Sequence, residues 1–216
     1  MRNCSFQCIF KRLHRRFGPQ GWWPAQSPFE VMVGAVLTQN TSWGNVEKAI
    51  TALRDAACLS PEAIHDADTG RLAELIRPAG YFNVKAVRLK ALTDWLQHNG
   101  GIDAIATMQV KDLRRELLAV HGIGPETADD ILLYAFGHPV FVIDAYTRRL
   151  FSRLGLVDET ASYESLRRQF EIALGKDAKL YNQFHALIVM QAKDVCRKRP
   201  QCTMCCLADV CPGARK

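Results

Sequence analysis

Hydrophobic residues recur at helical spacing along almost the whole sequence, and no segment sustains the alternation typical of a half-buried strand. The one β-like run, HPVFVI at 138–143, is short and isolated. The pattern predicts an all-α fold with short connections, without internal repeats or low-complexity linkers. Helices are expected at 29–40, 46–57, 71–76, 84–97, 111–120, 125–136, 145–154, 163–174 and 179–193.

Charge and hydropathy narrow the class of protein. The chain has 216 residues, enough for one domain or two small ones, and a net charge of +6, which favours a polyanionic partner. No stretch reaches the 18 or so uninterrupted apolar residues of a membrane span. The basic N-terminus, MRNCSFQCIFKRLHRRFG, lacks the long apolar segment of a signal peptide, although a basic membrane-binding helix is an alternative there.

Four of the eight cysteines have the spacing of metal ligands near the C-terminus. They form the run C-x5-C-x2-C-x5-C and are Cys196, Cys202, Cys205 and Cys211. The gaps leave out a fifth cysteine, Cys206. Four thiolates in a short loop suit zinc or a [4Fe–4S] cluster, but zinc ribbons usually pair two C-x2-C knuckles and this run has one. Without a recognisable signal peptide, disulfides are not expected. This expectation includes the scattered Cys4, Cys8 and Cys58.

A basic segment lies between the first two cysteines of the run. Arg197, Lys198 and Arg199 would be held on a short loop, where they predict a finger that contacts phosphates. The alternative is a solvated basic loop.

The segment LLAVHGIGPETADDILLYAFG predicts two apolar helices joined by a very short hairpin. Pro125 suits the first position of the second helix, because proline lacks the N–H that would have no partner there. Gly122 and Gly124 allow a positive φ and let a phosphate approach the bare backbone. The alternative is a plain connection between two helices.

The hairpin, together with FGHPVFVIDAYTRRL, closely resembles the helix–hairpin–helix of the DNA glycosylase superfamily that includes endonuclease III. The resemblance implies two helical domains with DNA and a base pocket in the cleft between them. One domain would comprise residues 29–138, with the helix–hairpin–helix at about 112–136. The other would comprise residues 1–28 and 139–216, with the cluster loop at 196–211. It also implies that Gly122, Gly124 and Thr127 bind DNA, with a monovalent cation at the hairpin. Asp144 matches the catalytic aspartate, while by itself it would be a helix N-cap.

The cysteine spacing is similar to the cluster loop of endonuclease III-type glycosylases, one residue shorter in the first gap. The resemblance therefore implies a [4Fe–4S] cluster with a structural role.

Three further stretches, GWWPA, LTQNTSW and RPAGYFNVKAVRL, resemble a narrower branch, the bacterial 3-methyladenine DNA glycosylases on the endonuclease III fold. Known members of that branch often lack the cysteine loop. Gln39 matches a residue that fills the space left by a flipped base, with a buried amide or helix cap as the alternative. The base pocket would be lined by Trp22, Trp23, Pro24, Trp43 and Glu126. Without the resemblance, the tryptophans predict core packing, and Glu126 a favourable charge in a first helical turn.

Several basic residues could either contact phosphates or lie on a solvated surface: Lys85, Arg88, Lys90, Arg148 and Arg149. Lyase members of the superfamily carry a lysine where this chain has Glu126, so we expect a monofunctional enzyme that leaves an abasic site. The implied substrate is an alkylated purine in double-stranded DNA, flipped out of the helix before its glycosidic bond is hydrolysed. The implied setting is a monomer in a bacterial or archaeal cytoplasm. Two alternatives stay open: an endonuclease III-like glycosylase and lyase for oxidised pyrimidines, and a non-catalytic DNA-binding module.

Overall fold

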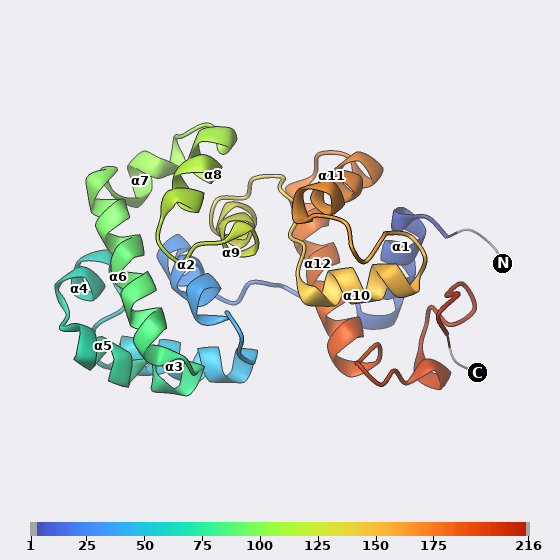
Figure 1. The fold of residues 1–216 in the computed structure, drawn as a ribbon, viewed down its shortest axis with the longest axis horizontal. Coiled ribbons are helices and arrows are strands. Elements are labelled where there is room, and N and C mark those ends of the chain that lie inside the picture. Colours follow the sequence, from blue (N-terminus) through green and yellow to red (C-terminus); the bar gives the residue numbers. More distant parts are fainter. Residues whose placement is uncertain (1–3, 215–216) are drawn as a thin grey trace. The chain divides into compact units, whose positions relative to one another are not determined.

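The computed structural model describes residues 4–214, and among them helices are the only regular secondary structure (Figure 1). The prediction of an all-α fold is confirmed. The chain divides into two compact units: Ala25–His138 forms one, and the chain before Ala25 and after His138 forms the other. Within the described residues, no helix is long and apolar enough to cross a membrane.

The unit Ala25–His138 is built around one helix that is apolar except for Glu30. Residues Phe29 to Leu37 of α2 (Pro28–Leu37) are all buried, because the helix is packed on every side. Its neighbours include α3, α6, α9 and the π-helical turn Ile131–Ala135. The other helices are α3 (Trp43–Asp55), α4 (Pro61–Asp66), α5 (Thr69–Leu75), α6 (Phe82–His98), α7 (Gly101–Ala106), α8 (Val110–Ala119) and α9 (Pro125–Asp130), with the 3-10 turn Arg77–Ala79.

Local capping explains where α2 begins. The Ser27 hydroxyl accepts a hydrogen bond from the Glu30 N–H at 3.2 Å, and Pro28 occupies the first helical turn, where a missing N–H has no cost. Glu30 is itself buried and accepts a hydrogen bond from Arg54 at 2.8 Å, which joins α2 to α3.

The second unit has an aromatic core. It contains α1 (Phe6–Phe17), α10 (Ala145–Arg153), α11 (Tyr163–Leu174), α12 (Ala178–Asp194) and the 3-10 turn Cys202–Met204. The ring of Phe170 stacks on Phe141 with centroids 4.3 Å apart and meets Phe151 at 4.6 Å. Phe141 belongs to the β-like run 138–143, which is a non-helical segment that forms no strand. Its apolar residues reflect burial between helices rather than a sheet.

The helix α1 was not predicted, since the many basic residues of 1–18 hide its amphipathic pattern. Ile9 and Leu13 are fully buried, so the apolar side of this helix packs into the protein and not onto a membrane. Residues 1–3 of that basic segment lie outside the described residues. The short α4 and α7 were also missed.

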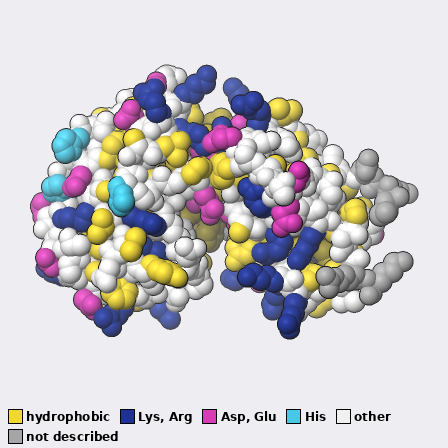
Figure 2. All heavy atoms as spheres, in the orientation of Figure 1, with side chains coloured by type: hydrophobic (Ala, Val, Ile, Leu, Met, Phe, Trp, Pro, Cys, Tyr) yellow, Lys and Arg dark blue, Asp and Glu magenta, His cyan; other side chains and the backbone are white. Residues whose placement is uncertain are grey.

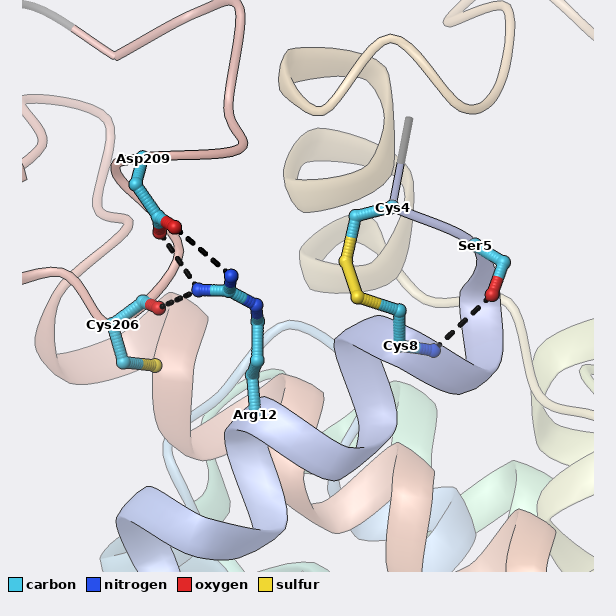
Figure 3. The surroundings of a disulfide bond; sticks show 6 residues. All are labelled: Cys4, Ser5, Cys8, Arg12, Cys206 and Asp209. Carbon is cyan, nitrogen blue, oxygen red and sulfur yellow. Dashed lines mark hydrogen bonds and ion pairs between the residues drawn. A yellow bond between two sulfur atoms is a disulfide. The ribbon is translucent and has the colours of Figure 1, made fainter. Parts of the chain in front are cut away.

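The expectation of no disulfides is wrong for one pair. Cys4 and Cys8 are joined by a disulfide at the start of α1 (Figure 3). One turn further along α1, Arg12 donates two hydrogen bonds to the Asp209 carboxylate, at 2.7 and 2.9 Å, and one to the Cys206 carbonyl at 3.3 Å. The first helix therefore holds the C-terminal cysteine loop.

Candidate nucleic-acid site and cysteine loop

A tight hairpin joins α8 to α9. Gly122 has φ +83°, a conformation that favours glycine, whereas Gly124 has φ −92° and ψ 177°, which any residue adopts. Of the two glycines that allow a positive φ, only Gly122 adopts one. The two helices are locked across the hairpin by Arg114, whose guanidinium donates to both oxygens of fully buried Asp129 at 2.6 and 3.2 Å.

Gln39, just beyond the end of α2, braces this hairpin. Its Nε2 donates to the Gly122 carbonyl at 3.1 Å and to the Thr127 hydroxyl at 2.9 Å. Its Oε1 accepts a hydrogen bond from Arg88 of α6. The Gly122 carbonyl can only accept and the Arg88 guanidinium can only donate, so these two partners fix the orientation of the amide. Gln39 is hydrogen-bonded but only partly buried, and its position is compatible with both interpretations of this residue.

An open pocket lies beside this brace, and its walls include Gln39, Arg88, Glu126 and Thr127. Thr127 is buried and Glu126 is exposed in the first turn of α9. Both interpretations of Glu126 are therefore compatible with its position: it lies where a helix favours an acid, and it borders a pocket.

Most of the basic residues that were left open have structural partners. Lys85 is buried and donates to the carbonyls of Leu37 and Ala79, both at 2.8 Å. Burial, and then the charge of Arg88, lower the pKa of Lys85 to about 8. The remaining side chains also donate to backbone carbonyls: Lys90 to His65 and Ala67, Arg148 to Glu159 and Ala161, and Arg149 to Ala192 and Cys196.

Asp144 is the N-cap of α10. One carboxylate oxygen accepts a hydrogen bond from the Thr147 N–H at 2.6 Å, and the other lies 3.7 Å from Nε2 of His185 in α12. Burial raises the pKa of Asp144, but the hydrogen bonds and charge of His185 and the Thr147 N–H outweigh it, so the pKa is lowered overall. The carboxylate is thus held ionised and oriented. Sequence reasoning missed His185.

The tryptophans are divided between the units. Trp22 and Trp23, followed by Pro24, precede the boundary at Ala25, and their ring centroids are 5.4 Å apart at 47°. Trp43 is the first residue of α3 in the other unit, which also holds Glu126. All three tryptophans are partly exposed.

The four predicted ligands line one small, partly open pocket beside the end of α10: Cys196, Cys202, Cys205 and Cys211. Cys206 is not among the described residues that line it. No group of three or more His, Cys, Asp or Glu side chains in residues 4–214 is arranged to hold a metal ion, so the predicted cluster is not confirmed.

The surroundings of the cysteine sulfurs nevertheless suit a bound metal cluster. Burial, and also charge repulsion from the neighbouring thiols, raise the pKa of Cys205 and of Cys211. Polar N–H groups nevertheless point at the sulfurs: Arg153 lies 3.3 Å from Cys196 Sγ, and Gln191 lies 3.1 Å from Cys205 Sγ. Four crowded sulfurs with hydrogen-bond donors fit thiolates shared around iron. Sequence reasoning missed Arg153 and Gln191.

Arg197, Lys198 and Arg199 are exposed at the start of the cysteine loop. The backbone of this segment is anchored by Arg153, which donates to the carbonyls of Arg197 and Lys198 at 2.7 and 3.1 Å. Figure 2 shows Lys and Arg side chains gathered around the C-terminal end of α12. A fixed backbone with exposed cations is suited to contacts with phosphates.

Comparison with known proteins identifies the family. Residues 33–175 match the model described as "HhH-GPD superfamily base excision DNA repair protein". A protein of Methanocaldococcus jannaschii named "Putative DNA repair glycosylase MJ1434" is 48% identical over 206 residues, which are 94% of either chain. Endonuclease III of Sulfolobus acidocaldarius is 29% identical over 185 residues, covering 85% of this chain and 81% of its own.

Solved structures agree with the sequence relatives. The H. pylori 3-methyladenine DNA glycosylase (MagIII) bound to 1,N6-ethenoadenine has a TM-score of 0.75 at 31% identity, covering 86% of this chain and 95% of that one. A non-covalent endonuclease III–DNA complex has a TM-score of 0.82 at 21% identity, covering 96% and 94%, and shows the fold alone.

The chain belongs to the HhH-GPD superfamily of base excision DNA repair proteins. Within that superfamily it is an endonuclease III-like DNA glycosylase, as its hairpin and the sequence around Asp144 predict.

Proposed function

We propose that this protein is a monofunctional DNA glycosylase that removes alkylated purines, such as 3-methyladenine, from double-stranded DNA. The observation that carries the proposal is the largely buried, oriented carboxylate of Asp144. Breaking the glycosidic bond builds positive charge on the sugar, and a fixed anion stabilises that charge without reorganising. With its pKa held low by His185 and Thr147, Asp144 is ionised at neutral pH and can also orient the attacking water.

The absence of lyase activity follows from Glu126. A lyase attacks the sugar carbon with an amine, and at this position of the hairpin the chain offers a carboxylate. Nearby Lys85 is no substitute, because its ammonium group donates to two buried carbonyls. Water is therefore the nucleophile, and the product is an abasic site.

The choice of an alkylated purine is supported by Trp22, Trp23 and Trp43. A purine methylated at N3 or N7 carries a positive charge, which the face of an indole ring attracts by about 0.5–2 kcal/mol. Such a base also leaves as a neutral molecule and needs little acid assistance. In this proposal Pro24 and Glu126 complete the base pocket. The similarity to the H. pylori 3-methyladenine DNA glycosylase at 31% identity supports the same substrate class.

DNA is held by the hairpin and the basic finger. Gly122, Gly124 and Thr127 form the phosphate grip, with a monovalent cation at the hairpin when DNA is bound, and Gln39 supports that grip. Arg197, Lys198 and Arg199 add contacts to the DNA backbone. Neither the hairpin nor the finger contacts a base, so both can bind DNA of any sequence. In this proposal the protein acts as a monomer in the cytoplasm.

A [4Fe–4S] cluster would be held by Cys196, Cys202, Cys205 and Cys211. When bound, it would supply iron–thiolate bonds that order a loop with little apolar content. Arg153 fixes the first part of that loop through its carbonyl contacts, and Arg12 fixes the last part through Asp209. These contacts keep the finger in place.

Release of methylated purines from alkylated DNA tests the proposal, with and without alkali to separate base release from strand cleavage. Asp144→Asn should react about 10²–10⁴-fold more slowly and should stay folded, because asparagine is an equally good N-cap. Asp177→Asn, which changes the N-cap of α12 in the same way, should retain full activity. Full activity of Asp144→Asn, or no release by the wild type, would overturn the proposal.

An endonuclease III-like glycosylase and lyase is the second candidate, favoured by the cysteine loop and by relatives named endonuclease III. Borohydride trapping distinguishes the two, since only an amine nucleophile gives a reducible covalent adduct with DNA. A trapped adduct on DNA containing an oxidised pyrimidine would replace the main proposal. If wild-type protein binds lesion DNA tightly and releases no base from any lesion, a non-catalytic DNA-binding module is the answer.

A further inference from the structure

Gln191 is a fully buried polar residue in the otherwise apolar part of α12. Its side-chain amide lies between two adjacent cysteines of the loop: Nε2 donates to Cys205 Sγ at 3.1 Å, and Oε1 accepts from the Cys206 thiol at 3.9 Å. Its backbone carbonyl accepts a hydrogen bond from the Cys196 N–H at 2.7 Å. One residue thus contacts three of the five cysteines in this region.

The two ends of the amide require different sulfurs. An N–H group is satisfied by a sulfur that accepts, as a metal-bound thiolate does, whereas a carbonyl oxygen is satisfied by a thiol that still carries its hydrogen. A buried amide with the opposite arrangement would leave both of its ends unsatisfied, at a cost in stability. The amide of Gln191 therefore favours Cys205 as a bound thiolate and Cys206 as a free thiol.

Two further contacts separate the neighbouring cysteines. The Leu207 N–H donates to Cys205 Sγ at 3.4 Å, which gives that sulfur a second hydrogen bond. The carbonyl of Cys206 is held by Arg12 of α1, which is anchored to Asp209 (Figure 3). Cys205 lines the pocket shared with the other three cysteines, and its neighbour does not.

We propose that Gln191 is a positioning residue that directs cluster ligation to Cys205 instead of Cys206 and raises the reduction potential of the bound cluster. This inference rests on the proposed [4Fe–4S] cluster. The potential rises because an N–H group directed at a ligand sulfur stabilises the more negative, reduced form. The x2 and x5 gaps of the sequence select Cys205 as the ligand and leave out Cys206. The contacts of Gln191 give a physical reason why Cys206 does not bind the cluster.

The test uses the full-length protein purified with its iron and sulfide under anaerobic conditions. Gln191→Leu removes the amide, and Gln191→Glu keeps the shape but replaces the N–H donor with an acceptor. Gln201→Leu is the matched control, because its exposed side chain lies in the same loop. Native protein is labelled with iodoacetamide, then chelated, unfolded and labelled with an isotopic form, so that mass spectrometry reports which cysteine was protected.

In the wild type and in Gln201→Leu, Cys206 should take the first label and Cys205 the second. In Gln191→Leu the first label on Cys205 should increase at least threefold. Its midpoint potential should fall by about 59 mV, a tenfold loss of preference for the reduced form in a one-electron couple. Gln191→Glu should retain less iron than Gln191→Leu, since a carboxylate repels the thiolate.

Protection of Cys206 in the wild type would overturn the inference. So would a Gln191→Leu protein whose labelling pattern and potential match those of Gln201→Leu. If the wild type contains neither iron nor acid-labile sulfide, the proposed cluster itself fails and the assignment of Gln191 fails with it. A wild type that contains the cluster but shows no effect of Gln191 refutes the positioning role alone.

Discussion

The two glycines of the hairpin give a sharp test of how the turn is built, because their alanine variants should differ. A Cβ at Gly122 would lie 2.3 Å from Cγ of Arg88 and would also sit at φ +83°. Arg88 would have to move and would lose its hydrogen bond to Gln39. Gly124, by contrast, has an ordinary φ, and no described atom lies within 4 Å of a Cβ placed there.

Two effects set the loss of stability expected for Gly122→Ala: backbone strain and the lost hydrogen bond of Arg88. The left-handed conformation costs alanine about 1–2 kcal/mol, and losing a hydrogen bond from a charged donor costs about 1.5–3 kcal/mol. Gly122→Ala should therefore lower the free energy of unfolding by about 2.5–5 kcal/mol. Gly124→Ala should change it by less than about 1 kcal/mol, in either direction.

Urea denaturation without DNA, followed by tryptophan fluorescence, measures both variants. Adding Arg88→Ala separates the two terms: in that background Gly122→Ala should cost only the backbone strain of about 1–2 kcal/mol. Equal stability of Gly122→Ala and Gly124→Ala, or the same cost of Gly122→Ala with and without Arg88, would refute the reasoning.

Three other predictions concern buried charges. Because the pKa of Lys85 falls from 10.5 to about 8 on folding, the unfolded chain binds more protons between these values. The free energy of unfolding should rise from pH 8 to pH 10.5 in the wild type, and urea titrations of Lys85→Met should lack this slope. Arg114→Met removes the bidentate partner of buried Asp129 and should cost about 3 kcal/mol in the same assay. His185→Ala should raise the pKa of Asp144, so the acid limb of the pH–rate profile for base release should move to higher pH.

The helices were predictable where apolar residues follow the helical period over ten or more positions. Each of the nine expected segments overlaps an observed helix. The segment 125–136 was expected as one helix, but it turns from α-helical to π-helical at Ile131. Three consecutive residues there, Ile131, Leu132 and Leu133, are buried, and an apolar run of this kind does not reveal how many residues fill each turn.

The chemical environment of the site was less predictable because it depends on contacts between distant residues. The sequence left Lys85 open between phosphate contact and a solvated surface, and only the fold shows that its ammonium group donates to the carbonyls of Leu37 and Ala79. His185 and Gln191 carried a signal that was not used: each is a polar residue inside the apolar run of α12. Buried polar groups need partners, so such residues deserve a search for one.

The hairpin illustrates how the same residue type can perform two different tasks within three positions. The face of Gly122 is covered by Arg88, and its carbonyl accepts a hydrogen bond from Gln39, so the protein's own side chains support the backbone conformation of this glycine. Gly124 needs no special φ and has open space in front of it among the described residues. In the proposed phosphate grip, a phosphate would use the space at Gly124, and the conformation at Gly122 places that space at the start of α9. A glycine required by the backbone and a glycine required by a ligand look identical in the sequence, and only their surroundings distinguish them.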